Sequence, residues 1–153
     1  MDKQTIYFYD RASERVKQEH IFLNNYFESP FTLHGQEFKT VEHYYQACKF
    51  KGQSFEQIRL APSPDEAKRL AHEFDVDLEV WNQKKDQVMR EALQAKFSQN
   101  PQLKELLIET RDCRLVEDSP RDAYWGGAIE GSANRLGQML EELREHYKMS
   151  LKL

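Results

Sequence analysis

The sequence predicts a small α+β domain that is mostly helical. Most of its 153 residues lie in segments whose apolar side chains recur every three or four positions, as in amphipathic helices. Short β-branched and aromatic runs occur only near the start of the chain and at 114–117. No Gly/Ser-rich or Pro-rich linker divides the chain, so we expect a single domain over 1–153 with its core at about 5–147.

The first third of the chain carries most of the strand signals. TIYFY at 5–9 predicts a strand, and 31–39 predicts a hairpin that turns at His34-Gly35. Residues 10–20 are strongly charged and give no assignment. Thr40 is placed to cap a helix over about 41–51.

Helices account for most of the remainder. A capping box at Ser54 predicts a short helix, and a second box at 63–66 predicts another. Asp77 can cap a long helix over about 78–98, which Asn100-Pro101 ends. The apolar positions that mark two further helices are Leu103, Leu106 and Leu107 for the first, and Leu136, Leu140, Leu143 and Tyr147 for the second, at about 133–148.

Composition excludes several classes of protein. The net charge of −4 argues against binding of nucleic acid through general electrostatic attraction. Cys48 and Cys113 cannot make a disulfide framework and lack metal-ligand spacing, so we expect no metal. The N-terminus has no signal-peptide pattern and no run is apolar enough to span a membrane. We therefore expect a monomeric cytoplasmic protein.

The segment at 115–137, LVEDSPRDAYWGGAIEGSANRLG, is the first candidate site. Asp118, Asp122 and Trp125 lie close together before a glycine loop that leads into the last helix. Such a loop can stack a flat ring beside charge. It is equally well a tight surface turn whose tryptophan fills the core.

The helix at 41–51 is the second candidate. Glu42, Gln46 and Lys49 form a polar stripe on one face, because seven residues are nearly two helical turns. The alternative is an acid favoured by the helix dipole and a solvated lysine. Cys48 falls on the apolar face, which makes it an unpromising nucleophile.

The chain has no nucleotide-binding P-loop, dinucleotide fingerprint, zinc-protease motif or serine-hydrolase elbow. The remaining groups suit cleavage at the anomeric carbon of a sugar. A carboxylate can stabilise positive charge on the sugar or activate water, and an aromatic ring can hold the leaving base. A lysine can attack an opened sugar as a Schiff base or bind phosphate. Gly131-Ser132 at a helix start would suit phosphate.

The chain also resembles the NADAR, or YbiA-like, domain family. The matching segments run in the family order over about 5–147. They are FLNNYFESPF, GQEFKTVEHYYQACKF, SPDEAKRLA, the region of Trp81 and Met89, KFSQNPQLKELLIET and LVEDSPRDAYWGGAIEGSANRLGQMLEELRE. Asn24 stands where the family usually has serine.

The resemblance implies a compact, largely helical N-glycosidase without a cofactor. One branch of the family cleaves early phosphorylated riboflavin-pathway intermediates, and another removes ADP-ribose from guanine in DNA or RNA. It implies acid/base roles for Glu42 and Asp122 and a contact between Lys49 and the reactive end of the sugar. The substrate-binding residues implied are Asn24, Trp81, Trp125, Gly126 and Asn134, the last either fixing the loop or binding phosphate.

Our first hypothesis is removal of ADP-ribose from guanine in nucleic acid, since a small domain with no fused biosynthetic domain fits repair. The second is hydrolysis of the riboflavin-pathway intermediates. A third, from another class, is a module that binds ADP-ribose or NAD without chemistry. A purely structural interaction domain is the fourth.

Overall fold

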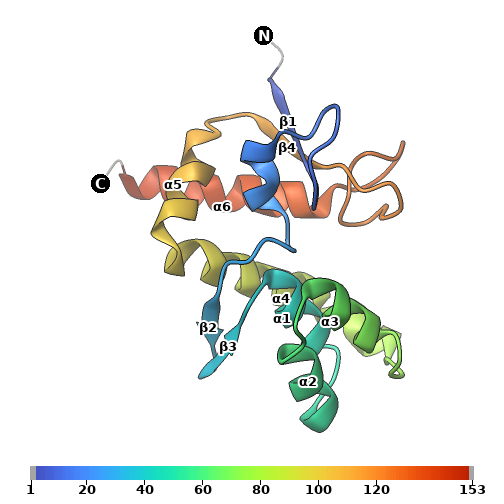
Figure 1. The fold of residues 1–153 in the computed structure, drawn as a ribbon. Coiled ribbons are helices and arrows are strands. Elements are labelled where there is room, and N and C mark those ends of the chain that lie inside the picture. The colour runs from blue at the N-terminus through green and yellow to red at the C-terminus, as the bar shows by residue number, and fades with distance from the viewer. Residues whose placement is uncertain (1–2, 152–153) are drawn as a thin grey trace. The chain divides into compact units, whose positions relative to one another are not determined.

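The structure, a computed structural model, describes residues 3–151 and is about 52% helical (Figure 1). Its contacts divide the chain into two compact units. Unit 1 comprises residues 1–24 and 102–153, and unit 2 comprises residues 25–101. The prediction of a mostly helical α+β fold is confirmed, and the expectation of a single domain stays a prediction.

Unit 1 is built around two parallel strands, β1 (Thr5–Phe8) and β4 (Arg114–Glu117), which lie side by side in Figure 1. Parallel neighbours need a long connection, and here that connection carries the whole of unit 2. Both strands were predicted from the sequence. The predicted β1 covered residues 5–9, one residue more than the strand in the structure. Within the unassigned segment, Val16 bridges to Tyr7, and the 3₁₀ helix η1 (Gln18–Leu23) follows.

Two helices complete unit 1, α5 (Pro101–Glu109) and α6 (Arg135–Leu151). Helix α6 packs directly on β4, because a Cβ added at Gly137 would lie 1.9 Å from the carbonyl oxygen of Leu115. The helix begins two residues later than predicted, since Asn134 has a φ of 50° that no right-handed helix accepts. It also extends three residues beyond the predicted end at 148.

Unit 2 begins with the antiparallel hairpin of β2 (Phe31–Leu33) and β3 (Gln36–Phe38). His34 and Gly35 both have positive φ, 53° and 76°, as a two-residue hairpin turn requires. The hairpin and its turn are therefore confirmed. Phe38 packs its ring edge-on against Tyr44 with centroids 4.8 Å apart, which joins the hairpin to the helical layer.

Four helices form the rest of unit 2: α1 (Val41–Ala47), α2 (Gly52–Arg59), α3 (Pro64–Ala71) and α4 (Leu78–Gln99). Helix α1 contacts the other three. The predicted caps Thr40, Ser63 and Asp77 each accept a hydrogen bond from a first-turn N–H. The predicted start of α2 at Ser54 is wrong, because the helix begins two residues earlier, at Gly52.

Candidate functional site

Helix α1 places a carboxylate in the interior of unit 2. Glu42 lies in its first turn and is 8% exposed, and its N–H donates to the Asn25 carbonyl at 3.2 Å. The Gln46 side-chain N–H donates to Glu42 Oε1 at 2.8 Å, one helical turn away. The start of the helix and the Gln46 amide therefore both present N–H groups on the side of this carboxylate.

Lys49 lies just beyond α1, which ends at Ala47 rather than at 51 as predicted. The backbone still turns as a helix there, because the Lys49 N–H donates to the Gln46 carbonyl at 3.2 Å. Burial lowers the pKa of the Lys49 amine; Glu42 acts in the opposite direction and Lys68 adds to the lowering. A larger fraction of this amine is therefore neutral than for an ordinary lysine.

An aromatic pair flanks the lysine. The Tyr45 and Trp81 rings meet edge-on with centroids 5.0 Å apart. Lys49 Nζ lies 5.5 Å from the Tyr45 ring centroid and 5.7 Å from that of Trp81. Lys84 Nζ lies 5.9 Å from the Trp81 ring, so two cations share one aromatic surface. Trp81 is 5% exposed, and this one side chain serves both the core of α4 and the surroundings of Lys49.

His43 in α1 and Cys48 directly after it are structural. His43 is fully buried, with Nε2 3.0 Å from the Ala61 carbonyl and Nδ1 2.8 Å from Thr40 Oγ1. A carbonyl only accepts, so Nε2 carries the proton and the ring is neutral when Nδ1 accepts from Thr40. Burial raises the pKa of the Cys48 thiol to about 11, which agrees with our expectation that it is not a nucleophile.

Two amide oxygens beside Glu42 were not selected from the sequence. Gln46 Oε1 and Asn25 Oδ1 are buried and have no hydrogen-bond partner among the described residues. Leaving such an acceptor unpaired costs about 1–3 kcal/mol, and folded proteins pair nearly all of them. Gln46 belongs to the polar stripe recognised in the sequence, but pairing is a tertiary property that periodicity does not reveal.

In unit 1, Asp122 organises the glycine loop. Its Oδ1 accepts from the N–H groups of Tyr124 and Trp125 at 2.9 and 2.8 Å. The Asp122 N–H itself donates to Ser119 Oγ at 3.1 Å. This is the local turn chemistry of aspartate, so one oxygen of this carboxylate is already engaged with backbone. Its predicted acid/base role stays a prediction.

The turn packs tightly around Trp125 and Gly126. Trp125 is 8% exposed and meets the Tyr124 ring edge-on with centroids 4.8 Å apart. A Cβ added at Gly126 would lie 2.6 Å from the Asp122 carbonyl oxygen, so only glycine fits. These contacts are those of a core-filling turn, and a substrate contact by either residue stays a prediction.

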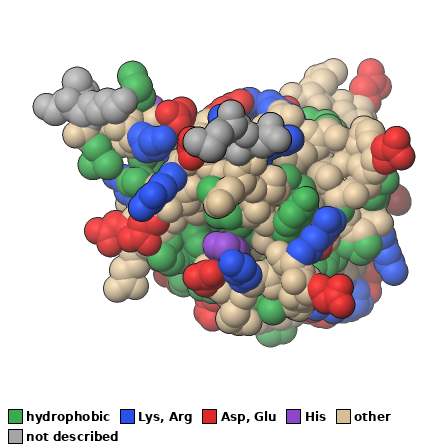
Figure 2. Space-filling model, turned by 90° about the horizontal axis from the view of Figure 1, so that it is seen from above, with side chains coloured by type: hydrophobic (Ala, Val, Ile, Leu, Met, Phe, Trp, Pro, Cys, Tyr) green, Lys and Arg blue, Asp and Glu red, His purple; other side chains and the backbone are tan. Residues whose placement is uncertain are grey.

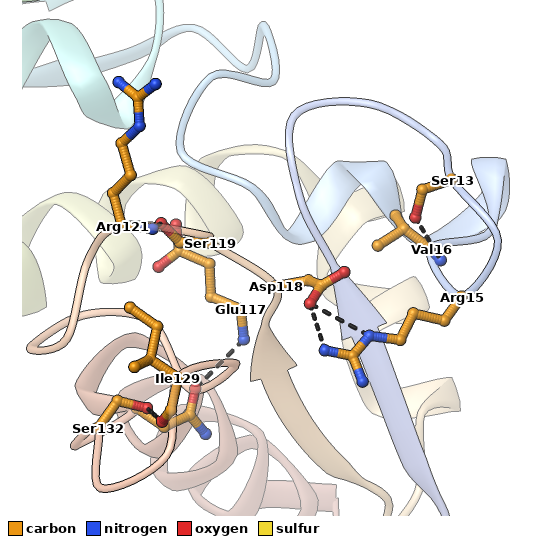
Figure 3. Close-up of polar contacts among 10 residues, drawn as sticks. Ser13, Arg15, Val16, Glu117, Asp118, Ser119, Arg121, Ile129 and Ser132 are labelled. Carbon is orange, nitrogen blue, oxygen red and sulfur yellow. Dashed lines mark hydrogen bonds and ion pairs between the residues drawn. The ribbon is translucent and has the colours of Figure 1, made fainter.

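Asn134 bonds to the free edge of β4. Its Oδ1 accepts from the Glu117 N–H at 3.2 Å, and its Nδ2 donates to the Leu115 carbonyl at 2.9 Å. The dashed line at Glu117 in Figure 3 marks the first of these bonds. The amide thus pairs with β4 as a neighbouring strand would. These are the bonds of a loop-fixing residue, and phosphate binding by the same amide stays a prediction.

Asp118 faces away from this turn. Figure 3 shows the Arg15 guanidinium directed at Asp118, with Nη2 2.6 Å from Oδ1. The same guanidinium lies 4.1 Å from the Tyr7 ring centroid. Asp118 is therefore part of an ion pair that ties the loop after β4 to the segment after β1.

Asn24 closes η1 and ends unit 1. It is 4% exposed, and its N–H donates to the Ile21 carbonyl at 2.9 Å. The predicted site residues thus fall into two groups. Unit 2 holds Glu42, Lys49 and Trp81 near one another. Unit 1 holds Asn24 directly after η1 and four residues in the loop before α6: Asp122, Trp125, Gly126 and Asn134.

No helix within residues 3–151 has the length and apolar character needed to cross a membrane. Over the same residues, no group of three or more His, Cys, Asp or Glu side chains is placed to hold a metal ion.

Comparison with known proteins identifies relatives across nearly the whole chain. N-glycosidase YbiA of Escherichia coli (strain K12) is 42% identical over 125 residues, which cover 80% of this chain and 78% of the relative. N-glycosidase Npun_R5314 of Nostoc punctiforme is 39% identical over 157 residues, covering 97% and 96%. Riboflavin biosynthesis protein VVA0006 of Vibrio vulnificus is 35% identical over 156 residues, covering 97% of this chain and 41% of that protein.

The solved structures agree with the sequence relatives. The NMR structure of E. coli YbiA matches with a TM-score of 0.82 and 36% sequence identity, covering 98% of this chain and 88% of that one. The family model described as the NADAR domain matches residues 7–148. The resemblance drawn from the motifs is thereby confirmed: the chain belongs to the NADAR domain family.

Proposed function

We propose that this protein is an N-glycosidase that hydrolyses the bond between the anomeric carbon of a phosphorylated pentose and a base nitrogen. The observation that carries the proposal is a buried carboxylate in the first turn of α1 that interacts electrostatically with a lysine seven residues later, whose pKa burial lowers. Relatives that share this segment are named N-glycosidases.

Glu42 is the group we assign to the reacting sugar. Cleavage of the glycosidic bond puts positive charge on the ring, which a carboxylate stabilises, or the carboxylate takes a proton from the attacking water. Glu42 leads Asp122 in this role because one oxygen of Asp122 already holds two backbone N–H groups.

Lys49 has two possible roles. As a neutral amine it can displace the base at the anomeric carbon, with the C–N bonding electrons and the amine proton passing to the base. The ring C–O bond of the resulting glycosylamine then opens to give an imine and a sugar hydroxyl, and water releases the sugar and restores the amine. As a cation it can hold phosphate. The lowered pKa supports the first role, and the nearby Lys68 and Lys84 supply charge for the second.

The substrate we propose is ADP-ribosylated guanine in nucleic acid, as the motif set suggested. The aromatic pair of Tyr45 and Trp81 suits a flat base, and the lysines around it suit a pyrophosphate. Figure 2 shows acidic and basic side chains mixed on the face in view, so that face offers no uniformly basic surface for the phosphate backbone of nucleic acid.

The second candidate substrate is an early phosphorylated intermediate of riboflavin synthesis. It is favoured by the Vibrio relative, which is named a riboflavin biosynthesis protein and contains a region similar to nearly all of this chain. Both substrates present a phosphorylated pentose, so the chemistry at Glu42 and Lys49 would be the same. A binding module without chemistry is disfavoured, because a domain that only recognises its ligand would have little need to keep Glu42 and Lys49 together.

Mass spectrometry tests the proposal. The protein is incubated with an oligonucleotide carrying one ADP-ribosyl-guanine and, separately, with the phosphoribosylamino-pyrimidine intermediate. We expect the ADP-ribosyl-guanine to be cleaved, with the unmodified oligonucleotide and free ADP-ribose as products. Glu42→Gln should lower kcat at least about 100-fold while changing binding little. Glu79→Gln, at the same helical position in α4 but exposed, is the matched control.

Cleavage of the pathway intermediate alone would move the assignment to riboflavin metabolism. Binding of ADP-ribose with no cleavage of either compound would contradict the N-glycosidase proposal and favour the binding module. Equal loss of binding and turnover in Glu42→Gln would make Glu42 a binding residue only.

A further inference from the structure

We propose that Gln46 and Asn25 are specificity residues whose side-chain oxygens accept hydrogen bonds from the adjacent ring hydroxyls of the pentose. This inference rests on the proposed function, since it names the part of the substrate that the same site reads. It starts from the two buried acceptors, Gln46 Oε1 and Asn25 Oδ1, that have no partner within residues 3–151.

The Gln46 amide cannot be turned round. Its nitrogen donates to Glu42 Oε1 at 2.8 Å, and a carboxylate can receive a hydrogen bond only from the NH₂ end of the amide. The Gln46 side-chain oxygen therefore points away from the Glu42 carboxylate. Gln46 is 3% exposed, so bulk water does not supply the missing donor.

Asn25 is oriented in the same manner. Its Nδ2 lies 3.7 Å from Met89 Sδ, and a thioether sulfur only accepts, so the amide nitrogen faces the sulfur. The Asn25 carbonyl in turn accepts from the Glu42 N–H at 3.2 Å. Each of the two unpaired oxygens thus belongs to a residue that is hydrogen-bonded to Glu42.

This arrangement matches a pentose better than a base. Gln46 lies one turn after Glu42 and three residues before Lys49, the two groups that we assign to the anomeric carbon. The nearest donors on the substrate are the ring hydroxyls at C2 and C3, which lie one and two carbons from that atom. Hydrogen bonds to the C2 hydroxyl also strengthen as the glycosidic bond breaks.

The bond from Gln46 to Glu42 gives this contact a second effect. A hydroxyl that donates to Gln46 Oε1 makes the amide N–H a better donor to the carboxylate, because linked hydrogen bonds polarise one another. A correctly placed pentose would therefore strengthen the hold on Glu42. A sugar that lacks the C2 hydroxyl would leave a buried acceptor unpaired, which is how polar sites reject such analogues.

The test compares a ribose glycoside with its 2-deoxy analogue in wild-type protein, Gln46→Met and Asn25→Leu. The quantity measured is the ratio of kcat/KM for the two sugars, so that their different intrinsic reactivities cancel between proteins. We expect the preference for ribose to fall roughly tenfold or more in Gln46→Met, because removing the hydroxyl and removing its acceptor break the same bond. Gln57→Met and Asn82→Leu, on exposed faces of α2 and α4, should leave the preference unchanged.

A binding arm separates this inference from the proposed function. Titration calorimetry with ribose 5-phosphate and 2-deoxyribose 5-phosphate needs no turnover. Wild-type protein should prefer the first, and Gln46→Met should lose that preference. If no glycoside is cleaved but the binding preference follows Gln46, the proposed reaction is wrong and the acceptor role stands.

The inference is overturned if both variants cleave substrate with the wild-type preference, since the oxygens would then serve only bound water. Gln46→Asn provides a second variant should Gln46→Met fail to fold. It keeps an amide but withdraws its oxygen by one methylene, and it should lower the preference in the same direction.

Discussion

Replacing Asn134 decides between loop fixing and phosphate binding. The Asn134 amide makes two hydrogen bonds to the edge of β4, and the residue is buried with a φ of 50°. Asn134→Gly removes both hydrogen bonds and at the same time relieves the backbone strain of the positive φ. Two buried backbone groups then lack partners, at about 1–3 kcal/mol each, so the free energy of unfolding should fall by about 2–6 kcal/mol.

Asn134→Ala separates the backbone contribution from that of the hydrogen bonds. It loses the same two bonds and must also hold a left-handed conformation, which costs about 1–2 kcal/mol for a residue with a Cβ. The alanine variant should therefore be less stable than the glycine variant by about that amount. Asn134→Asp should fall between wild type and glycine, because it keeps an acceptor for Glu117 but has no donor for Leu115.

Urea denaturation of the three variants, with KM measured on the folded fraction, is the assay. Loop fixing predicts the stability order wild type, aspartate, glycine, alanine, with KM little changed. The reasoning is refuted if Asn134→Gly unfolds within about 0.5 kcal/mol of wild type, the range of an ordinary surface change. A raised KM with full stability would instead make Asn134 a ligand for the substrate phosphate.

Four other substitutions or pH changes test the unit 2 site. Lys49→Arg should abolish turnover, because a guanidinium cannot act as a neutral amine, whereas Lys51→Arg, at an exposed position, should leave turnover unchanged. Borohydride should trap the sugar covalently on Lys49, and an enzyme that is active but cannot be trapped would exclude the imine. Burial lowers the pKa of His43, so its contribution to stability is complete above about pH 6.5 and is lost as the pH falls toward the pKa of the folded state. The loss is at most about 1.4 kcal/mol per pH unit. The free energy of unfolding should therefore depend less steeply on pH in His43→Gln than in the wild-type protein, which denaturation across this pH range measures. With its pKa raised to about 11, Cys48 should resist iodoacetamide at pH 7.5, and Cys48→Ser should stay active; rapid inactivation blocked by that substitution would contradict this. Asn25→Leu should raise the free energy of unfolding by about 1 kcal/mol, because it deletes an unpaired acceptor, and a destabilised variant would show that the oxygen is satisfied in solution.

Features encoded by neighbouring residues were predicted well. The turn at His34-Gly35 and the caps Thr40, Ser63 and Asp77 depend on groups within three residues, so the pattern carries the physics. The start of α2 was misjudged for the same reason. Ser54 satisfies a local capping pattern, but the helix begins two residues earlier, at Gly52.

Features that depend on distant partners were not predicted. Asn134 pairs with Leu115 and Glu117, 19 and 17 residues earlier, and no local period signals that an amide will complete a sheet edge. Asp122 stood out in the sequence as a carboxylate beside a glycine loop, but its hydrogen bonds to the N–H groups of Tyr124 and Trp125 appear only in the folded turn. The sequence can indicate a polar side chain as a candidate site residue. Only the fold shows which of its atoms already make hydrogen bonds within the protein.

The atoms left unused in unit 2 are the strongest link between this fold and its proposed chemistry. Glu42 is buried and held by Gln46, and the oxygens of Gln46 and Asn25 stay unpaired beside it. A core selected only for stability would fill these positions with apolar side chains or pair the oxygens. Their retention is understandable if a ligand supplies the donors. The unpaired oxygens that destabilise the protein without ligand would then stabilise its complex with a pentose. They would stabilise most of all the transition state in which the glycosidic bond is breaking.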